Sequence, residues 1–202
     1  MRKDKIPDIL TFVRLAGALP IMVVLYLQLT YPSLSDLKWL NILLFSLFWI
    51  FAGTDLFDGL IARRLGITSS FGILFDPVAD KIIILGPLLI LLKMDRGVHL
   101  LPVLIMVLRE IIITGLRSVA AARGMIIRAS PLGKSKMFFQ ELSVGFFIIE
   151  GIEILPFLST RTLAQIFLWI AMVISLLSGL EYFWGFLKSR KEEMYKKQVQ
   201  VK

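Results

Sequence analysis

The sequence has no cysteine and a single histidine, His99, among its 202 residues. Disulfides, thiol chemistry and thiolate metal sites are therefore excluded. One histidine cannot supply a two-histidine metal site or a pair of phosphohistidine nucleophiles, and we interpret His99 as an interfacial residue. Any chemistry must rest on Asp, Glu, Lys, Arg and hydroxyl groups.

Charged residues are also scarce. They make up 19% of the chain, whereas hydrophobic residues make up 57% and the mean hydropathy is +0.80. A soluble domain has about 25% charged residues and is nearer half apolar. Because the apolar residues are clustered in long runs, the composition indicates a membrane protein. The absence of an internal repeat weakens the case for a transporter built from duplicated halves.

The apolar runs predict an all-α integral membrane protein with six transmembrane helices. About 20 residues are needed to cross the hydrocarbon core, and Gly, Pro and Ser mark the breaks between runs. The first run is too long for a signal peptide and has no cleavage site, so we interpret it as a span. The predicted domain covers residues 1–187, and residues 188–202 form a polar cytoplasmic tail. The spans lie near residues 8–30, 38–64, 72–93, 98–122, 133–155 and 161–187.

The basic residues set the predicted orientation. The net charge is +8, which the positive-inside rule explains without nucleic-acid binding. Lys81 and Arg109 fall inside predicted spans. On one side of the predicted membrane the only basic residues are Lys38, Lys93, Arg96 and Arg161. All the other Lys and Arg residues lie on the opposite side. Both termini are therefore expected in the cytoplasm, where basic residues also attract anionic membrane lipid.

Two pairs of aspartates lie near the predicted cytoplasmic face. Asp55 and Asp58 are at i and i+3 near the end of the second span, and Asp76 and Asp80 are at i and i+4 near the start of the third. Each pair therefore shares one helix face. Because a short loop joins these antiparallel helices, we expect all four carboxylates to converge one to two turns below the cytoplasmic surface.

Four carboxylates in a medium of low dielectric constant repel one another unless protons or a cation neutralise them. An all-oxygen ligand set suits hard cations such as Mg²⁺, Mn²⁺ or Ca²⁺. The alternative is a set of local roles, with Asp76 at a helix dipole and Asp58 paired with Arg63 or Arg64. Charged residues within spans are costly, so four together favour a functional site.

The segment from Asp55 to Asp80 resembles the signature of the CDP-alcohol phosphatidyltransferase family. That signature is Asp-x2-Asp-Gly-x2-Ala-Arg-x8-Gly-x3-Asp-x3-Asp, and every fixed position is filled. The resemblance implies a multi-pass enzyme of the cell membrane that transfers a phosphatidyl group from CDP-diacylglycerol to a small alcohol. It further implies a homodimer and an active site open to the cytoplasm.

The resemblance also implies roles for the motif residues. Asp55, Asp58 and Asp76 would bind two divalent ions, Mg²⁺ or Mn²⁺. Asp80 would share a metal and act as the general base. Two metals can clamp the attacking and leaving oxygens of a displacement. The residues that would contact the CDP moiety are Asp55, Asp58, Gly59, Ala62, Arg63, Gly72 and Thr11.

A group of basic residues bears on the acceptor. Arg109 and Arg117 lie in the fourth predicted span, and Lys134 and Lys136 open the fifth. Arg forks and Lys hold a phosphate, which a neutral alcohol would not need. These four residues therefore predict the site of an acceptor phosphate. The alternative is that they are positive-inside charges with a local Arg109–Glu110 pair.

Residues 108–117 and 132–136 resemble the branch of the family whose acceptor is glycerol 3-phosphate. The opening segment 6–14 resembles it too, although Asp8 replaces the usual Asn, and its Thr11 and Arg14 would approach the nucleotide. Inositol phosphate, serine and phosphatidylglycerol are alternative acceptors. A divalent-metal transporter is a further alternative, but transporter sites lie near the bilayer midplane, whereas this cluster lies near one face.

Overall fold

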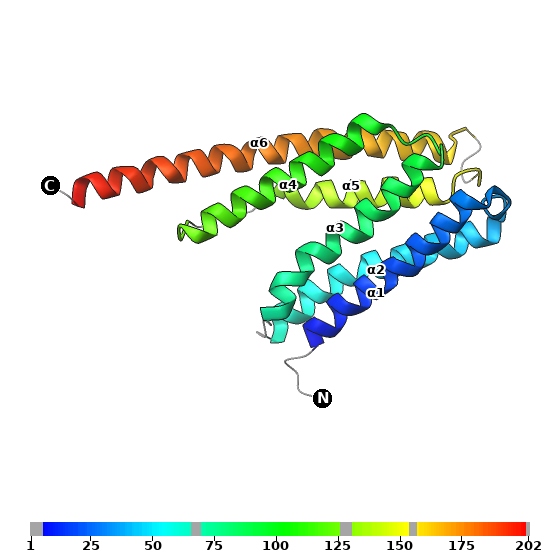
Figure 1. Ribbon diagram of the computed structural model, residues 1–202, viewed down its shortest axis with the longest axis horizontal. Helices are drawn as coiled ribbons and strands as arrows, with labels where there is room; N and C mark the ends of the chain where they lie inside the picture. The colour runs from blue at the N-terminus through cyan, green and yellow to red at the C-terminus, as the bar shows by residue number, and fades with distance from the viewer. Residues whose placement is uncertain (1–5, 66–69, 126–130, 154–156, 201–202) are drawn as a thin grey trace. The chain divides into compact units, whose positions relative to one another are not determined.

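A computed structural model describes the backbone of residues 6–65, 70–125, 131–153 and 157–200. Side chains are described for residues 12–53, 78–79, 81–125, 132–133, 135–153 and 157–191. Within the described backbone the chain forms six α-helices, one short 3₁₀ helix and no β-strand (Figure 1), which confirms the predicted all-α class. The elements are α1 (Ile6–Thr30), η2 (Pro32–Leu34), α2 (Lys38–Leu65), α3 (Ser70–Lys93), α4 (Leu100–Ala122), α5 (Pro131–Ile148) and α6 (Thr160–Gln200).

The first four helices agree with the predicted spans to within about two residues, but the last two differ. Helix α5 ends at Ile148, earlier than the predicted residue 155, and Gly151 just beyond it has φ 82°. Glycine adopts this left-handed conformation without strain and commonly follows a helix end. Helix α6 continues to Gln200, because the polar residues after Leu187 include many Lys and Glu, which favour helix, and no Pro or Gly.

The chain divides into two compact units. The first comprises Met1–His99 and Glu141–Ile166, and the second comprises Leu100–Gln140 and Phe167–Lys202. In the first unit, α1 packs against both α2 and α3 (Figure 1). Most residues of its buried core are aliphatic or aromatic, with Ile21, Leu25 and Phe48 fully inaccessible to solvent. These helices place the aspartate motif at one end of the first unit.

A buried polar cluster closes the opposite end of the first unit. Gln28 donates to Asn41 Oδ1 at 2.9 Å, and Asn41 donates to the Ser35 carbonyl at 2.9 Å. Arg96 donates to the Phe147 and Ile148 carbonyls at 3.1 and 2.7 Å. The last carbonyls of a helix have no partner within the helix, so Arg96 caps α5. Its second amino group donates to Gln28 Oε1 at 3.2 Å, which ties this cap to α1.

Two helices meet the length and apolarity required for a membrane span within the described residues. They are Phe12–Thr30 and Thr160–Lys191, and a shorter apolar stretch covers Lys38–Gly53. Many large apolar side chains in α1, α2, α4 and α6 are exposed, including Phe12, Ile111 and Trp184. Exposed apolar surface of this extent is typical of a protein that contacts membrane lipid.

Candidate active site

The aspartate motif occupies the last turns of α2 and the first turns of α3. Asp55 and Asp58 fall in α2, and Asp76 and Asp80 fall in α3. Within each pair the residues are therefore separated by about 4.5–6 Å along the helix axis. Their side chains lie outside the described residues, so the convergence of the four carboxylates stays a prediction. The same holds for the predicted nucleotide contacts Gly59, Ala62, Arg63, Gly72 and Thr11.

Two close glycine contacts fix how α1 lies against its neighbours. A Cβ atom built on Gly17 of α1 would lie 2.4 Å from the ring of Phe51 in α2, and one on Gly86 of α3 would lie 2.6 Å from Met22 Sδ in α1. Each glycine therefore permits a close approach that a side chain would prevent. Gly17 and Phe51 are level with each other, and so are Met22 and Gly86.

This register places Arg14 at the level of the motif. One turn before Gly17 in α1 is Arg14, and one turn after Phe51 in the antiparallel α2 is Asp55. The parallel helix α3 gives the same result. Eight residues before Met22 in α1 is Arg14, and eight residues before Gly86 in α3 is Val78. Val78 lies between Asp76 and Asp80. Arg14 is only 1% exposed. A buried guanidinium requires a compensating anion or full hydrogen bonding, and carboxylates are expected at its level.

The predicted acceptor residues belong to the second unit, where Glu110 joins two of them. Glu110 Oε1 accepts from Arg109 Nη1 at 2.9 Å and also from Lys136 Nζ. Arg109 Nη2 donates to Ser178 Oγ at 3.0 Å. The local Arg109–Glu110 pair that the sequence offered as an alternative is therefore present, but Lys136 from α5 and Ser178 from α6 also take part.

Arg117 lies two turns further along α4 and has a different environment. Its guanidinium carbon is 5.8 Å from the ring centroid of Tyr182 on α6, within range of a cation–π contact. The side chain is exposed, so it remains accessible to a ligand. The side chain of Lys134 lies outside the described residues.

The donor set of the motif fits a hard divalent cation. Four carboxylates supply only oxygen ligands, which Mg²⁺ and Mn²⁺ prefer. Among the side chains that the structure describes, no three His, Cys, Asp or Glu residues come close enough to share a metal, and the four aspartates are not among those side chains. The motif aspartates remain the predicted ligands of a metal centre.

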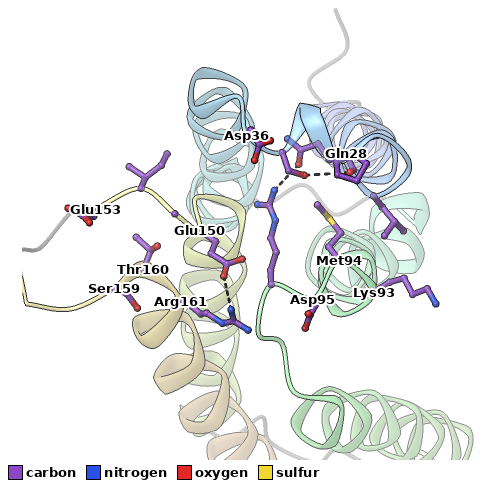
Figure 2. A pocket seen from close by; sticks show the side chains of 16 residues that line it. Gln28, Asp36, Lys93, Met94, Asp95, Glu150, Glu153, Ser159, Thr160 and Arg161 are labelled. Atoms are coloured by element: carbon purple, nitrogen blue, oxygen red, sulfur yellow. Dashed lines mark hydrogen bonds and ion pairs between the residues drawn. The ribbon is translucent and has the colours of Figure 1, made fainter.

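A cavity of about 710 Å³ lies at the other end of the first unit, away from the motif. Figure 2 shows Glu150 from the end of α5 and Arg161 from the start of α6 facing each other in its wall. Their closest oxygen and nitrogen atoms are 3.5 Å apart. Burial raises the pKa of Glu150 above its usual 4.5, although Arg161 and Arg96 oppose the rise and Asp95 adds to it.

The Glu150→Gln variant should be more stable than the wild type at neutral pH. Because the folded-state pKa is raised, the contribution of Glu150 to stability is fully present below its unfolded pKa and is lost as the pH rises through the folded pKa. The neutral amide removes this loss, so we expect a rise in Tm on the order of 2 °C at pH 7 and no difference near pH 4.

Thermal unfolding in detergent at both pH values measures the effect. The exposed Glu153, changed to Gln, is the matched control and should not alter Tm at either pH. A lower Tm for Glu150→Gln at pH 7 would show that the ion pair with Arg161 outweighs the cost of burial.

Comparison with known proteins gives a consistent result. The model of the CDP-alcohol phosphatidyltransferase family matches residues 4–177. A CDP-diacylglycerol–glycerol-3-phosphate 3-phosphatidyltransferase of Rickettsia prowazekii is 35% identical over 184 residues, which cover 91% of this chain and 96% of that protein. A protein of the same description from Bacillus subtilis is 37% identical over 147 residues, covering 71% and 74%. A probable phosphatidylglycerophosphate synthase of Mycobacterium tuberculosis is 30% identical over 181 residues, covering 90% and 81%.

Proposed function

The chain belongs to the CDP-alcohol phosphatidyltransferase family, and on that premise we propose that it transfers the phosphatidyl group of CDP-diacylglycerol to glycerol 3-phosphate. The products are CMP and phosphatidylglycerophosphate. The observation that carries this proposal is the complete aspartate motif within a chain that is similar, over most of its length, to CDP-diacylglycerol–glycerol-3-phosphate 3-phosphatidyltransferases. The basic network of the second unit supports an anionic acceptor.

The motif aspartates have two tasks in the proposed reaction. Members of this family generally use divalent metal ions, which when bound would offset negative charge on the reacting phosphates. Asp55, Asp58 and Asp76 would hold two such ions, Mg²⁺ or Mn²⁺, and would thereby orient the CDP moiety. Arg14, buried at the same level, would limit the repulsion among these carboxylates.

The proposed chemical step is a direct displacement at the phosphate next to diacylglycerol. Asp80 accepts the proton of the acceptor hydroxyl, and the hydroxyl oxygen forms a bond to that phosphorus. The bond between this phosphorus and the oxygen of CMP breaks, so CMP leaves with the electron pair. The neighbouring Gly59, Ala62 and Gly72 lack bulky side chains, so the nucleotide could approach the backbone closely.

The proposal is tested by product analysis. Purified protein in detergent or liposomes is given labelled CDP-diacylglycerol and, one at a time, glycerol 3-phosphate, inositol phosphate, serine and phosphatidylglycerol. We expect product only with glycerol 3-phosphate. Efficient transfer to another alcohol would support the family reaction but show that the acceptor is not glycerol 3-phosphate. No transfer to any alcohol would refute the proposed enzymatic activity.

Substitution of the predicted acceptor residues should raise the KM for glycerol 3-phosphate more than the KM for CDP-diacylglycerol. We expect Arg117→Ala, Lys134→Ala and Lys136→Ala each to raise the KM for glycerol 3-phosphate about tenfold or more, because each removes a charge-assisted contact to phosphate. The KM for CDP-diacylglycerol should change far less. Steady-state kinetics with each substrate varied in turn measure both constants.

Arg123→Ala is the matched control, since Arg123 is an exposed cation just beyond the end of α4. It should leave both KM values unchanged. Equal increases in the two KM values would assign the altered residues to the nucleotide instead, and no increase would identify them as surface charge.

We also propose the membrane arrangement. All six α-helices would cross the membrane, with both termini and the aspartate motif on the cytoplasmic side, and two copies of the chain would form a homodimer. The distribution of Lys and Arg supports the orientation. Helices α1 and α6 each contain an apolar stretch long enough to span the membrane, and their exposed apolar side chains would face lipid.

A further inference from the structure

Glu110 lies near the middle of α4, well inside a proposed membrane span. Its side chain is 15% exposed, and those of its partners Arg109 and Lys136 are 11% and 9% exposed. Burying a charge in a membrane protein is costly and usually reflects function. Here one carboxylate, that of Glu110, meets two cations, so its charge offsets only part of theirs.

The contacts show that Glu110 holds both cations in place. Arg109 and Glu110 are consecutive residues, which point in different directions from a helix. Their side chains nevertheless meet, and Lys136 reaches the same oxygen atom, Oε1, from α5. Glu110 therefore determines where the guanidinium and the ammonium lie relative to each other.

Helix α6 supports the other side of the Arg109 guanidinium. Ser178 accepts from Nη2, and its own hydroxyl donates to the Ser175 carbonyl at 3.0 Å. A Cβ atom on Gly179 would lie 3.2 Å from Arg109 Cγ, so the absence of a side chain gives the arginine room. The Nε atom of Arg109 is buried without a hydrogen-bond partner among the described residues. The guanidinium thus retains unused donor capacity next to the carboxylate oxygen that it shares with Lys136.

We propose that Glu110 is a positioning residue of the acceptor site, an inference that rests on the proposed function. It orients Lys136 and Arg109 and offsets part of their positive charge, so that a phosphate is held in one productive arrangement. Without this carboxylate, the two cations repel each other and separate. The cluster would then attract phosphate more strongly but position it less accurately.

The test distinguishes the effect of the charge of Glu110 from the effect of its side-chain length. Glu110→Gln keeps the size of the side chain and removes the charge, so we expect turnover to fall about 10- to 100-fold. Inorganic phosphate, used as the probe, should raise the Tm of this variant more than that of the wild type. Glu110→Asp keeps the charge and shortens the side chain, so turnover should fall while the phosphate-induced rise in Tm stays at the wild-type value.

Glu153→Gln, the same change at an exposed position, should alter neither turnover nor the phosphate effect. A phosphate-induced rise that is the same in the wild type and Glu110→Gln would overturn the inference, as would unchanged turnover in Glu110→Gln. If Glu110→Gln does not fold, Glu110→Asp decides: full turnover, or a changed phosphate effect, overturns the inference. Because the phosphate measurement needs no turnover, failure of the wild type to use glycerol 3-phosphate would refute the proposed function separately.

Discussion

Chelation of divalent metal should abolish phosphatidyl transfer by the purified protein, and Mg²⁺ or Mn²⁺ should restore it. The expectation follows from four aspartates on two packed helices, which would repel one another without a cation. Asp55→Asn, Asp58→Asn and Asp76→Asn should each reduce turnover at least about 100-fold, because bound metal typically supplies several kcal/mol of transition-state stabilisation. The measurements are transfer from labelled CDP-diacylglycerol across a metal titration and metal binding by calorimetry.

Asp36→Asn is the matched control for these substitutions. Asp36 is an exposed aspartate between η2 and α2, at the opposite end of the first unit from the motif. Its replacement should leave metal dependence and turnover unchanged. Full turnover of the wild type in metal-free buffer would refute the metal centre. An equal loss of activity in Asp36→Asn would show that the motif variants fail for a general electrostatic reason.

The helices could be predicted from sequence because each contains a long apolar run between residues that interrupt helices. The ends of α5 and α6 differ from the predicted span ends. Helix α5 ends at Ile148, where the left-handed Gly151 follows and Arg96, more than fifty residues earlier, donates to the last carbonyls. The local sequence contains no sign of the Arg96 hydrogen bonds. The sequence motif predicts which aspartates act, but how their carboxylates converge depends on packing that spacing alone does not determine.

The acceptor cluster shows a similar limit. Sequence reasoning selected Arg109 and Lys136 as cations and interpreted Glu110 only as a local partner of Arg109. The 26-residue separation between Glu110 and Lys136 gives no hint that they meet. The available signal was a lone carboxylate in the middle of an apolar helix, which is costly unless a cation compensates it. Likewise, only the glycine contacts along α1 indicate that Arg14 is level with the aspartate motif.

Asp80→Asn should differ from the other aspartate variants by retaining substrate binding. Asparagine keeps the size of the side chain and one oxygen atom, so metal and CDP-diacylglycerol should bind with only a modest loss. The amide cannot accept the proton of the acceptor hydroxyl. Because general acid–base catalysis contributes about 10²–10⁴-fold, the single-turnover rate should fall by that factor.

The position of Asp80 in α3 provides the physical reason for this difference. Asp80 lies one helical turn beyond Asp76, deeper in the proposed membrane, where an acceptor hydroxyl could lie between the base and the ligands of the metal. Pro77 lies between the two aspartates as the eighth residue of α3, where its missing N–H removes one hydrogen bond of the helix. The helix nevertheless continues through both aspartates.

Two measurements on the same preparations separate the roles of Asp80 and Asp58. Calorimetry gives the affinity for CDP-diacylglycerol in the presence of metal, and rapid mixing gives the single-turnover rate. In Asp58→Asn, both the affinity and the single-turnover rate should fall, whereas in Asp80→Asn mainly the single-turnover rate should fall. If Asp80→Asn loses nucleotide binding as completely as Asp58→Asn, Asp80 is chiefly a metal ligand, and another group must accept the proton.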